Sequence, residues 1–161
     1  MNCRKSMAKK KSLEWRNCSE EELASKVLDF APSVLTPGVL ILLEGEMGAG
    51  KSTFARAVVS SLCKRSRSQG SPTFPLVQEY RADAGFPIYH MDLYRLKSEE
   101  ELEHSGIAEQ IDARDALVMV EWASMFPGFF RGYSKGGSKR TVFTVEIAPE
   151  GESRSYRITS S

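Results

Sequence analysis

The chain has 161 residues, which is enough for one domain with a substantial hydrophobic core. Its 22 Lys and Arg nearly balance its 21 Asp and Glu, and this balance argues against a dedicated nucleic-acid binder. Three Cys without metal-type spacing suit free thiols in a reducing compartment, and no apolar run approaches the length of a membrane span. We therefore expect a cytoplasmic protein with no membrane contact.

The first half of the chain begins with a basic stretch and continues as alternating strands and helices. Residues 1–12 lack the apolar segment of a secretory signal, so we expect a disordered basic tail there and a single domain over 13–161. Ser19 and Glu22 form a capping-box pattern that opens a helix. In chain order the pattern predicts a strand over 12–18, a helix over 19–31 ended by prolines and a glycine, an unbroken apolar strand over 39–44 and an amphipathic helix over 51–64.

The second half reads as further strands with short helices between them. It predicts a loop over 63–75, two strands around a turn at 82–85, a short helix over 98–104 interrupted at Gly106, an apolar strand over 116–122, an irregular loop over 126–140 and two closing strands over 141–149 and 153–161. Strands that alternate with helices indicate an α/β fold with a mixed, mostly parallel sheet, and the closing pair suggests antiparallel strands at an edge.

The segment LLEGEMGAGKST contains the P-loop pattern G-x-x-x-x-G-K-[ST], matched by Gly45, Gly50, Lys51 and Ser52. Glycines let the backbone turn so that successive N–H groups face a phosphate chain, and the helix that follows adds the positive end of its dipole. The Lys51 ammonium can reach the β and γ phosphates, and the Ser52 hydroxyl can ligate Mg²⁺. The remaining expected phosphate-loop residues are Glu46, Met47, Gly48, Ala49 and Thr53.

Two acids are candidates for holding Mg²⁺ or placing a nucleophile. Glu121 ends a buried apolar run, at the edge of the sheet where ligands bind in open α/β folds. Asp92 follows another strand, and the residues alone leave open whether it is functional or part of a structural polar cluster with His90 and Arg95. Either acid could ligate Mg²⁺ directly or through water.

Taken together, GEMGAGKSTFARA, SPTFPLVQEY, YHMDLYRL, ELEHSGI and VMVEW resemble the TsaE family, also called YjeE, in order and spacing. The resemblance runs from about Glu14 to the C-terminus. It implies a three-layer P-loop NTPase fold that uses ATP and Mg²⁺. It further implies that Ser52, Asp92 and Glu121 surround the metal and the attacking water, and that Thr73 lies in a switch-like segment near the γ phosphate.

The same resemblance implies a role and partners. A TsaE-like ATPase supports the threonylcarbamoyladenosine modification of tRNA by docking on a TsaD-like protein that acts with a TsaB-like protein, so that tRNA is contacted only through the complex. ATP hydrolysis by the chain alone is expected to be slow. Ser19 and Arg154 would lie near the nucleobase, with a plain helix cap and a plain surface cation as the alternative interpretations.

Other functions remain open at this point. A small-molecule kinase of the shikimate-kinase type would need lid cations, for which Arg131, Lys139 and Arg140 are candidates. Guanine-reading P-loop proteins commonly use an Asn-Lys-x-Asp motif after the P-loop. Both asparagines of this chain, Asn2 and Asn17, precede the P-loop, so a GTPase switch is disfavoured. Direct RNA binding would rest on two basic clusters, which consist of Lys64, Arg65 and Arg67, and of Arg131, Lys135, Lys139 and Arg140.

Overall fold

The computed structural model describes residues 12–65, 72–74, 76–134 and 140–161. The expected tail lies outside the described residues apart from Ser12. The strands are β1 (Ser12–Cys18), β2 (Val39–Glu44), β3 (Pro72–Phe74), β4 (Val77–Arg81), β5 (Pro87–Asp92), β6 (Leu117–Glu121), β7 (Thr141–Glu150) and β8 (Ser153–Ser160). The helices are α1 (Glu20–Val34), α2 (Lys51–Leu62), α3 (Glu99–His104), α4 (Ile107–Ile111) and α5 (Pro127–Ser134), with a 3₁₀ turn over Ala123–Met125.

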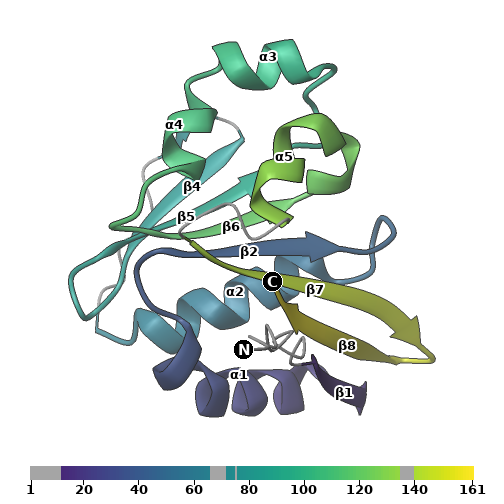
Figure 1. Ribbon diagram of the computed structural model, residues 1–161. Helices are drawn as coiled ribbons and strands as arrows, with labels where there is room; N and C mark the ends of the chain where they lie inside the picture. The colour runs from purple at the N-terminus through teal and green to yellow at the C-terminus, as the bar shows by residue number, and fades with distance from the viewer. Residues whose placement is uncertain (1–11, 66–71, 75, 135–139) are drawn as a thin grey trace, which may run out of the picture.

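The described strands form one mixed sheet in the order β1-β8-β7-β2-β6-β5-β4-β3. The central strands β7, β2, β6 and β5 are parallel to one another. The pairs β1–β8 and β8–β7 on one side, and β5–β4 and β4–β3 on the other, are antiparallel. Figure 1 shows α1 and α2 on one face of this sheet and α3, α4 and α5 on the other. The expected three-layer α/β architecture with antiparallel edges is confirmed.

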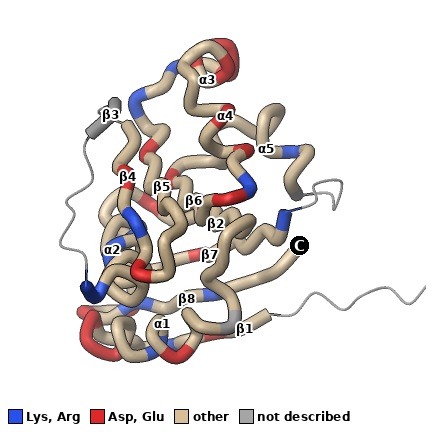
Figure 2. The backbone as a smooth tube through the Cα atoms, turned by 90° about the vertical axis from the view of Figure 1, so that its left-hand side faces the viewer, with Lys and Arg blue, Asp and Glu red and all other residues tan. Residues whose placement is uncertain are grey.

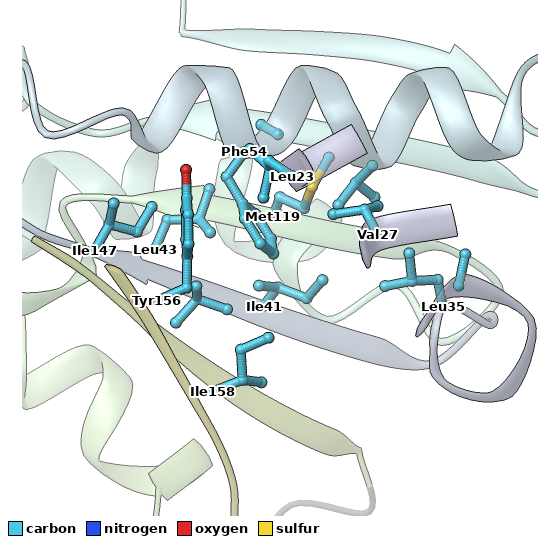
Figure 3. Close-up of a cluster of buried hydrophobic side chains, with 14 of the residues drawn as sticks. Leu23, Val27, Leu35, Ile41, Leu43, Phe54, Met119, Ile147, Tyr156 and Ile158 are labelled. Carbon is cyan, nitrogen blue, oxygen red and sulfur yellow. The ribbon is translucent and has the colours of Figure 1, made fainter. Parts of the chain in front are cut away.

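The central strand β2 is buried on both faces, as its unbroken apolar run predicts. Ile41 and Leu43 face the layer of α1 and α2, and Leu40 and Leu42 face the opposite layer. On the first face, Phe54 of α2 packs against Tyr156 of β8 with ring centroids 5.8 Å apart, as Figure 3 shows. This double burial fixes the position of the loop that follows β2.

Several segments differ from the sequence prediction, since β3 lies inside the expected loop over 63–75, α4 forms at 107–111, and α5 and the end of α1 also depart from it. Residues 126–140 were expected to be irregular, but α5 occupies 127–134, starting with proline at a favourable first-turn position. The Glu99 carboxylate accepts hydrogen bonds from the backbone N–H groups of Gly128 (2.7 Å) and Phe129 (3.3 Å), and so caps the helix from a distant segment. Helix α1 also continues through Pro32 to Val34 instead of ending before it.

The basic residue Arg140 is a structural clamp and not the loop cation or lid residue that the sequence suggested. It is only 7% exposed and donates to the carbonyls of Ile111 (2.6 Å), Ala113 (2.8 Å), Val39 (3.1 Å) and Ala116 (3.3 Å). These carbonyls belong to the first residue of β2, to the residue before β6, to the last residue of α4 and to the segment after α4, so one side chain connects three parts of the fold.

The described members of the two basic clusters are Lys64, Arg65 and Arg131, which are exposed, and Arg140, which is buried. Figure 2 shows Lys and Arg interspersed with Asp and Glu along the chain. Lys135, Lys139 and Arg67 lie outside the described residues. Across the part of the chain that the structure describes, no helix has the length and apolarity needed to cross a bilayer.

Candidate functional site

The P-loop connects the carboxyl end of β2 to the first residue of α2, at the edge of the sheet where β5 and β6 also end. Gly50 caps α2 with a left-handed backbone (φ 110°), which a residue with a Cβ adopts only with strain. Gly45 is required by a close approach, because a Cβ there would lie 2.6 Å from the carbonyl oxygen of Ile147. The loop is therefore held against β7 and turns directly into the N-terminus of α2.

Lys51 projects its ammonium back into this loop. It is 5% exposed, and Nζ donates to the carbonyl oxygens of Gly45 (2.6 Å) and Glu46 (3.0 Å). Nζ also lies 3.8 Å from the centroid of the Trp122 ring, a cation–π contact in a shielded environment. A buried ammonium enclosed by carbonyls and an indole is positioned to meet an anion that enters the loop.

Glu121 ends β6 beside the first turn of α2. Its Oε1 accepts hydrogen bonds from the Ser52 hydroxyl (2.8 Å) and from Nε2 of His90 (2.7 Å). Because a carboxylate can only accept, the imidazole nitrogen at this contact carries the proton. Three elements, α2, β5 and β6, thus converge on one carboxylate oxygen.

The environment of Glu121 keeps this group ionised. Burial acts to raise the pKa of the carboxyl, since only 3% of the residue is exposed. The hydrogen bonds from His90 and Ser52, together with the electrostatic attraction of His90 and Lys51, outweigh burial and hold the pKa of Glu121 below its ordinary value. The site therefore contains a preorganised negative charge next to the P-loop hydroxyl.

Asp92 ends β5 and is the register partner of Glu121. It is exposed, and its Oδ1 accepts from the backbone N–H of Tyr94 at 3.0 Å. Asp92 and Glu121 both line a cavity of about 330 Å³ whose other wall is the P-loop from Met47 to Thr53. The structure thus brings the two candidate acids and the P-loop into one cavity.

The resemblance also suggested roles for Arg154, Ser19 and Thr73, and each of these residues lies in a different part of the structure. Arg154 of β8 donates from Nε to the carbonyl of Ala49 (2.8 Å) and lines a smaller cavity of about 150 Å³ beside the P-loop. The Ser19 hydroxyl accepts from the N–H of Glu22 (3.2 Å) as the cap of α1. Thr73 lies in β3, and its side chain is outside the described part of the structure.

The donor set fits a nucleoside polyphosphate with Mg²⁺. The first turn of α2 presents backbone N–H groups without intrahelical partners, and Lys51 adds a full positive charge. No group of three or more His, Cys, Asp or Glu among the described residues is arranged as a metal cage. Two carboxylates and one hydroxyl suit Mg²⁺, because this ion retains several waters and shares phosphate oxygens with its protein ligands.

Two parts of the site were not assigned a role from the sequence. His90 was only a member of a possible polar cluster, and its bond to Glu121 depends on the pairing of β5 with β6. Trp122 has a left-handed backbone (φ 67°) directly after β6, which turns its ring over Lys51 and against Tyr94 at a centroid distance of 5.1 Å. The adjacency of Trp122 to an acid at a strand end was the available signal.

Comparison with known proteins gives consistent matches. Residues 16–156 match the family model described as Threonylcarbamoyl adenosine biosynthesis protein TsaE. A Rickettsia conorii protein named tRNA threonylcarbamoyladenosine biosynthesis protein TsaE is 39% identical over 107 residues, which are 66% of this chain and 59% of that protein. A Bacillus subtilis protein of the same name is 36% identical over 115 residues, covering 71% of this chain and 69% of that protein. The crystal structure of Bacillus subtilis YdiB superposes with a TM-score of 0.57 and 26% identity, over 94% of this chain and 86% of that one.

Proposed function

The chain belongs to the TsaE family of threonylcarbamoyl adenosine biosynthesis proteins, and from this premise we propose that it is a P-loop ATPase. It binds ATP with Mg²⁺ and hydrolyses it to sustain the modification of tRNA by TsaB-like and TsaD-like partners. The observation that carries the proposal is the cavity in which the P-loop, the buried Lys51 ammonium and the acids Asp92 and Glu121 meet.

Each residue has a distinct task in this proposal. Backbone N–H groups of the P-loop and the Lys51 ammonium bind the phosphate chain, and Arg154 borders the nucleobase side. Ser52, Glu121 and Asp92 would hold Mg²⁺, which when bound neutralises charge on the β and γ phosphate oxygens. His90 fixes the orientation of Glu121 through the 2.7 Å hydrogen bond.

The mouth of the cavity supports a partner-dependent activity. Met47 is 65% exposed and Tyr94 is 49% exposed, and both line the cavity that contains Lys51. Hydrolysis needs water to be excluded from all but the reacting position, and an open mouth of this kind is poorly suited to that task without a covering surface. We therefore expect slow turnover by the chain alone and faster turnover when TsaB-like and TsaD-like proteins are present.

The test measures phosphate release from ATP by the purified chain, with and without TsaB and TsaD proteins from the same source. We expect stimulation by the partners, and we expect Lys51→Ala to lower turnover by about 100-fold or more, because it removes the cation that binds the developing negative charge. Nucleotide binding is measured separately by calorimetry. Equal rates with and without partners would refute the coupling, and unchanged turnover in Lys51→Ala would refute the ATPase site.

A further inference from the structure

A second cavity of about 410 Å³ lies beyond the two acids. It shares Ser52, Asp92 and Glu121 with the P-loop cavity, so these residues form a common wall between the two spaces. Its remaining polar lining comes from α2, β4 and β5 and consists of Arg56, Gln78, Tyr80 and His90. The two cavities therefore meet at the hydroxyl and the two carboxylates.

Sheet register and helix periodicity explain why these side chains meet. Gln78 and His90 are register partners in the β4–β5 pair, and His90 in turn pairs with Met119 of β6, two residues before Glu121. Arg56 follows Ser52 by four residues, so both side chains lie on the same face of α2, one turn apart. The Ser52 hydroxyl donates to Glu121, and Arg56, one turn later, lines the second cavity.

The size and chemistry of the cavity exceed what an attacking water needs. One water needs about 10–15 Å³ of cavity volume on this measure, whereas the cavity measures about 410 Å³. Arg56 is the arginine among the described residues that line this cavity, and it supplies a positively charged guanidinium. That side chain is exposed, and its Nη2 donates to the Thr53 hydroxyl at 3.2 Å. A bond to a neutral hydroxyl is readily exchanged for a stronger bond to an oxyanion.

We propose that Arg56 binds the γ-phosphoryl group as it is transferred and then the phosphate product, within this second cavity. The proposal rests on the proposed ATPase function. The oxygen of a water molecule forms a bond to the γ phosphorus while the bond from that phosphorus to the bridging oxygen breaks. ADP leaves with the electron pair, and a proton of the water is released to solvent. Lys51 serves the nucleotide side of the reacting phosphorus, and Arg56 serves the side of the departing phosphate.

The test compares Arg56→Gln with a matched control, Arg65→Gln. Arg65 is also exposed and lies beyond Leu62, the last residue of α2, and the helix from Arg56 to Leu62 alone spans about 9 Å at 1.5 Å per residue. Two affinities are measured by calorimetry, that of the chain for ADP with Mg²⁺ and that of the ADP-loaded chain for orthovanadate, an oxyanion that mimics the phosphoryl group. Phosphate release from ATP is measured in parallel.

We expect Arg56→Gln to weaken orthovanadate binding and to slow phosphate release by about 10-fold or more, since a charge-assisted contact to the oxyanion is lost. ADP affinity should stay within about twofold of the wild type, which a general distortion of the site would not allow. Arg56→Lys should restore part of the orthovanadate affinity, and Arg65→Gln should leave all values unchanged.

The proposal is overturned if Arg56→Gln retains orthovanadate affinity, or if it loses ADP and orthovanadate affinity in equal proportion. Failure of the ATPase function has a different signature, because the wild-type chain would then release no phosphate with or without partners. The difference in orthovanadate affinity between the ADP-loaded wild type and ADP-loaded Arg56→Gln would in that case still decide whether Arg56 contacts an oxyanion.

Discussion

Replacing Arg140 by methionine should destabilise the whole domain, because this side chain holds the starts of two central strands. Its guanidinium donates to four carbonyl oxygens, those of Val39, Ile111, Ala113 and Ala116. Methionine has a similar length and no donor, so the substitution leaves those acceptors without this partner. Arg131 provides the matched control, since it is an exposed arginine of α5.

The expected magnitude follows from those four hydrogen bonds. Each contributes about 1 kcal/mol net, which sums to roughly 4 kcal/mol. Burial lowers the pKa of the Arg140 guanidinium, which shows that enclosing this charge has a cost that methionine avoids. We therefore expect a loss of about 3 kcal/mol in the free energy of unfolding, and a fall in Tm of roughly 6–12 °C for a domain of this size.

Thermal and urea unfolding of the wild type, Arg140→Met, Arg140→Lys and Arg131→Met measure this effect. Arg140→Lys keeps the charge with fewer donors and should fall between the wild type and Arg140→Met. Arg131→Met should stay within about 0.5 kcal/mol of the wild type, as exposed substitutions do. Equal Tm values for Arg140→Met and Arg131→Met would refute the conclusion that the hydrogen bonds of Arg140 stabilise the domain.

Two further predictions concern the site. ADP with Mg²⁺ should change the tryptophan fluorescence of the chain, because the Lys51 ammonium lies against the Trp122 ring. Trp122→Phe should abolish this change while the buried Trp15 continues to emit. A nucleotide-dependent signal that persists in Trp122→Phe would contradict the assignment of the change to Trp122. The depressed pKa of Glu121 means that its contribution to stability is complete above its ordinary value of 4.5 and is lost as the pH falls through the lower folded-state value. Urea midpoints between about pH 6 and pH 3 should therefore fall more steeply in the wild type than in Glu121→Gln, and parallel curves would show that Glu121 is not the group responsible.

Local patterns were enough to predict the parts of the site that lie close together in the chain. The P-loop motif between an apolar run and an amphipathic helix predicted the position of Lys51 and Ser52. The apolar run that stops at Glu121 predicted a buried strand with an acid at its carboxyl end. Those predictions needed only side-chain periodicity and the rule that parallel strands gather their carboxyl ends at one edge.

The remaining features depend on pairing between distant segments, which periodicity does not encode. His90 meets Glu121 only because β5 pairs with β6, and Arg140 is buried only because the starts of β2 and β6 converge on it. Helix α5 contains two glycines that weaken a helix in isolation, and its cap is supplied by Glu99 from another helix. For each of these residues the deciding partner lies more than twenty positions away.

The left-handed backbone of Trp122 links the deepest cation of the site to the molecular surface. Its indole contacts both the enclosed Lys51 ammonium and Tyr94, a residue that is 49% exposed. A rotation that withdraws the ammonium from the carbonyls of Gly45 and Glu46 removes the support on one side of the indole. A single indole therefore separates a buried cation from an aromatic side chain at the molecular surface.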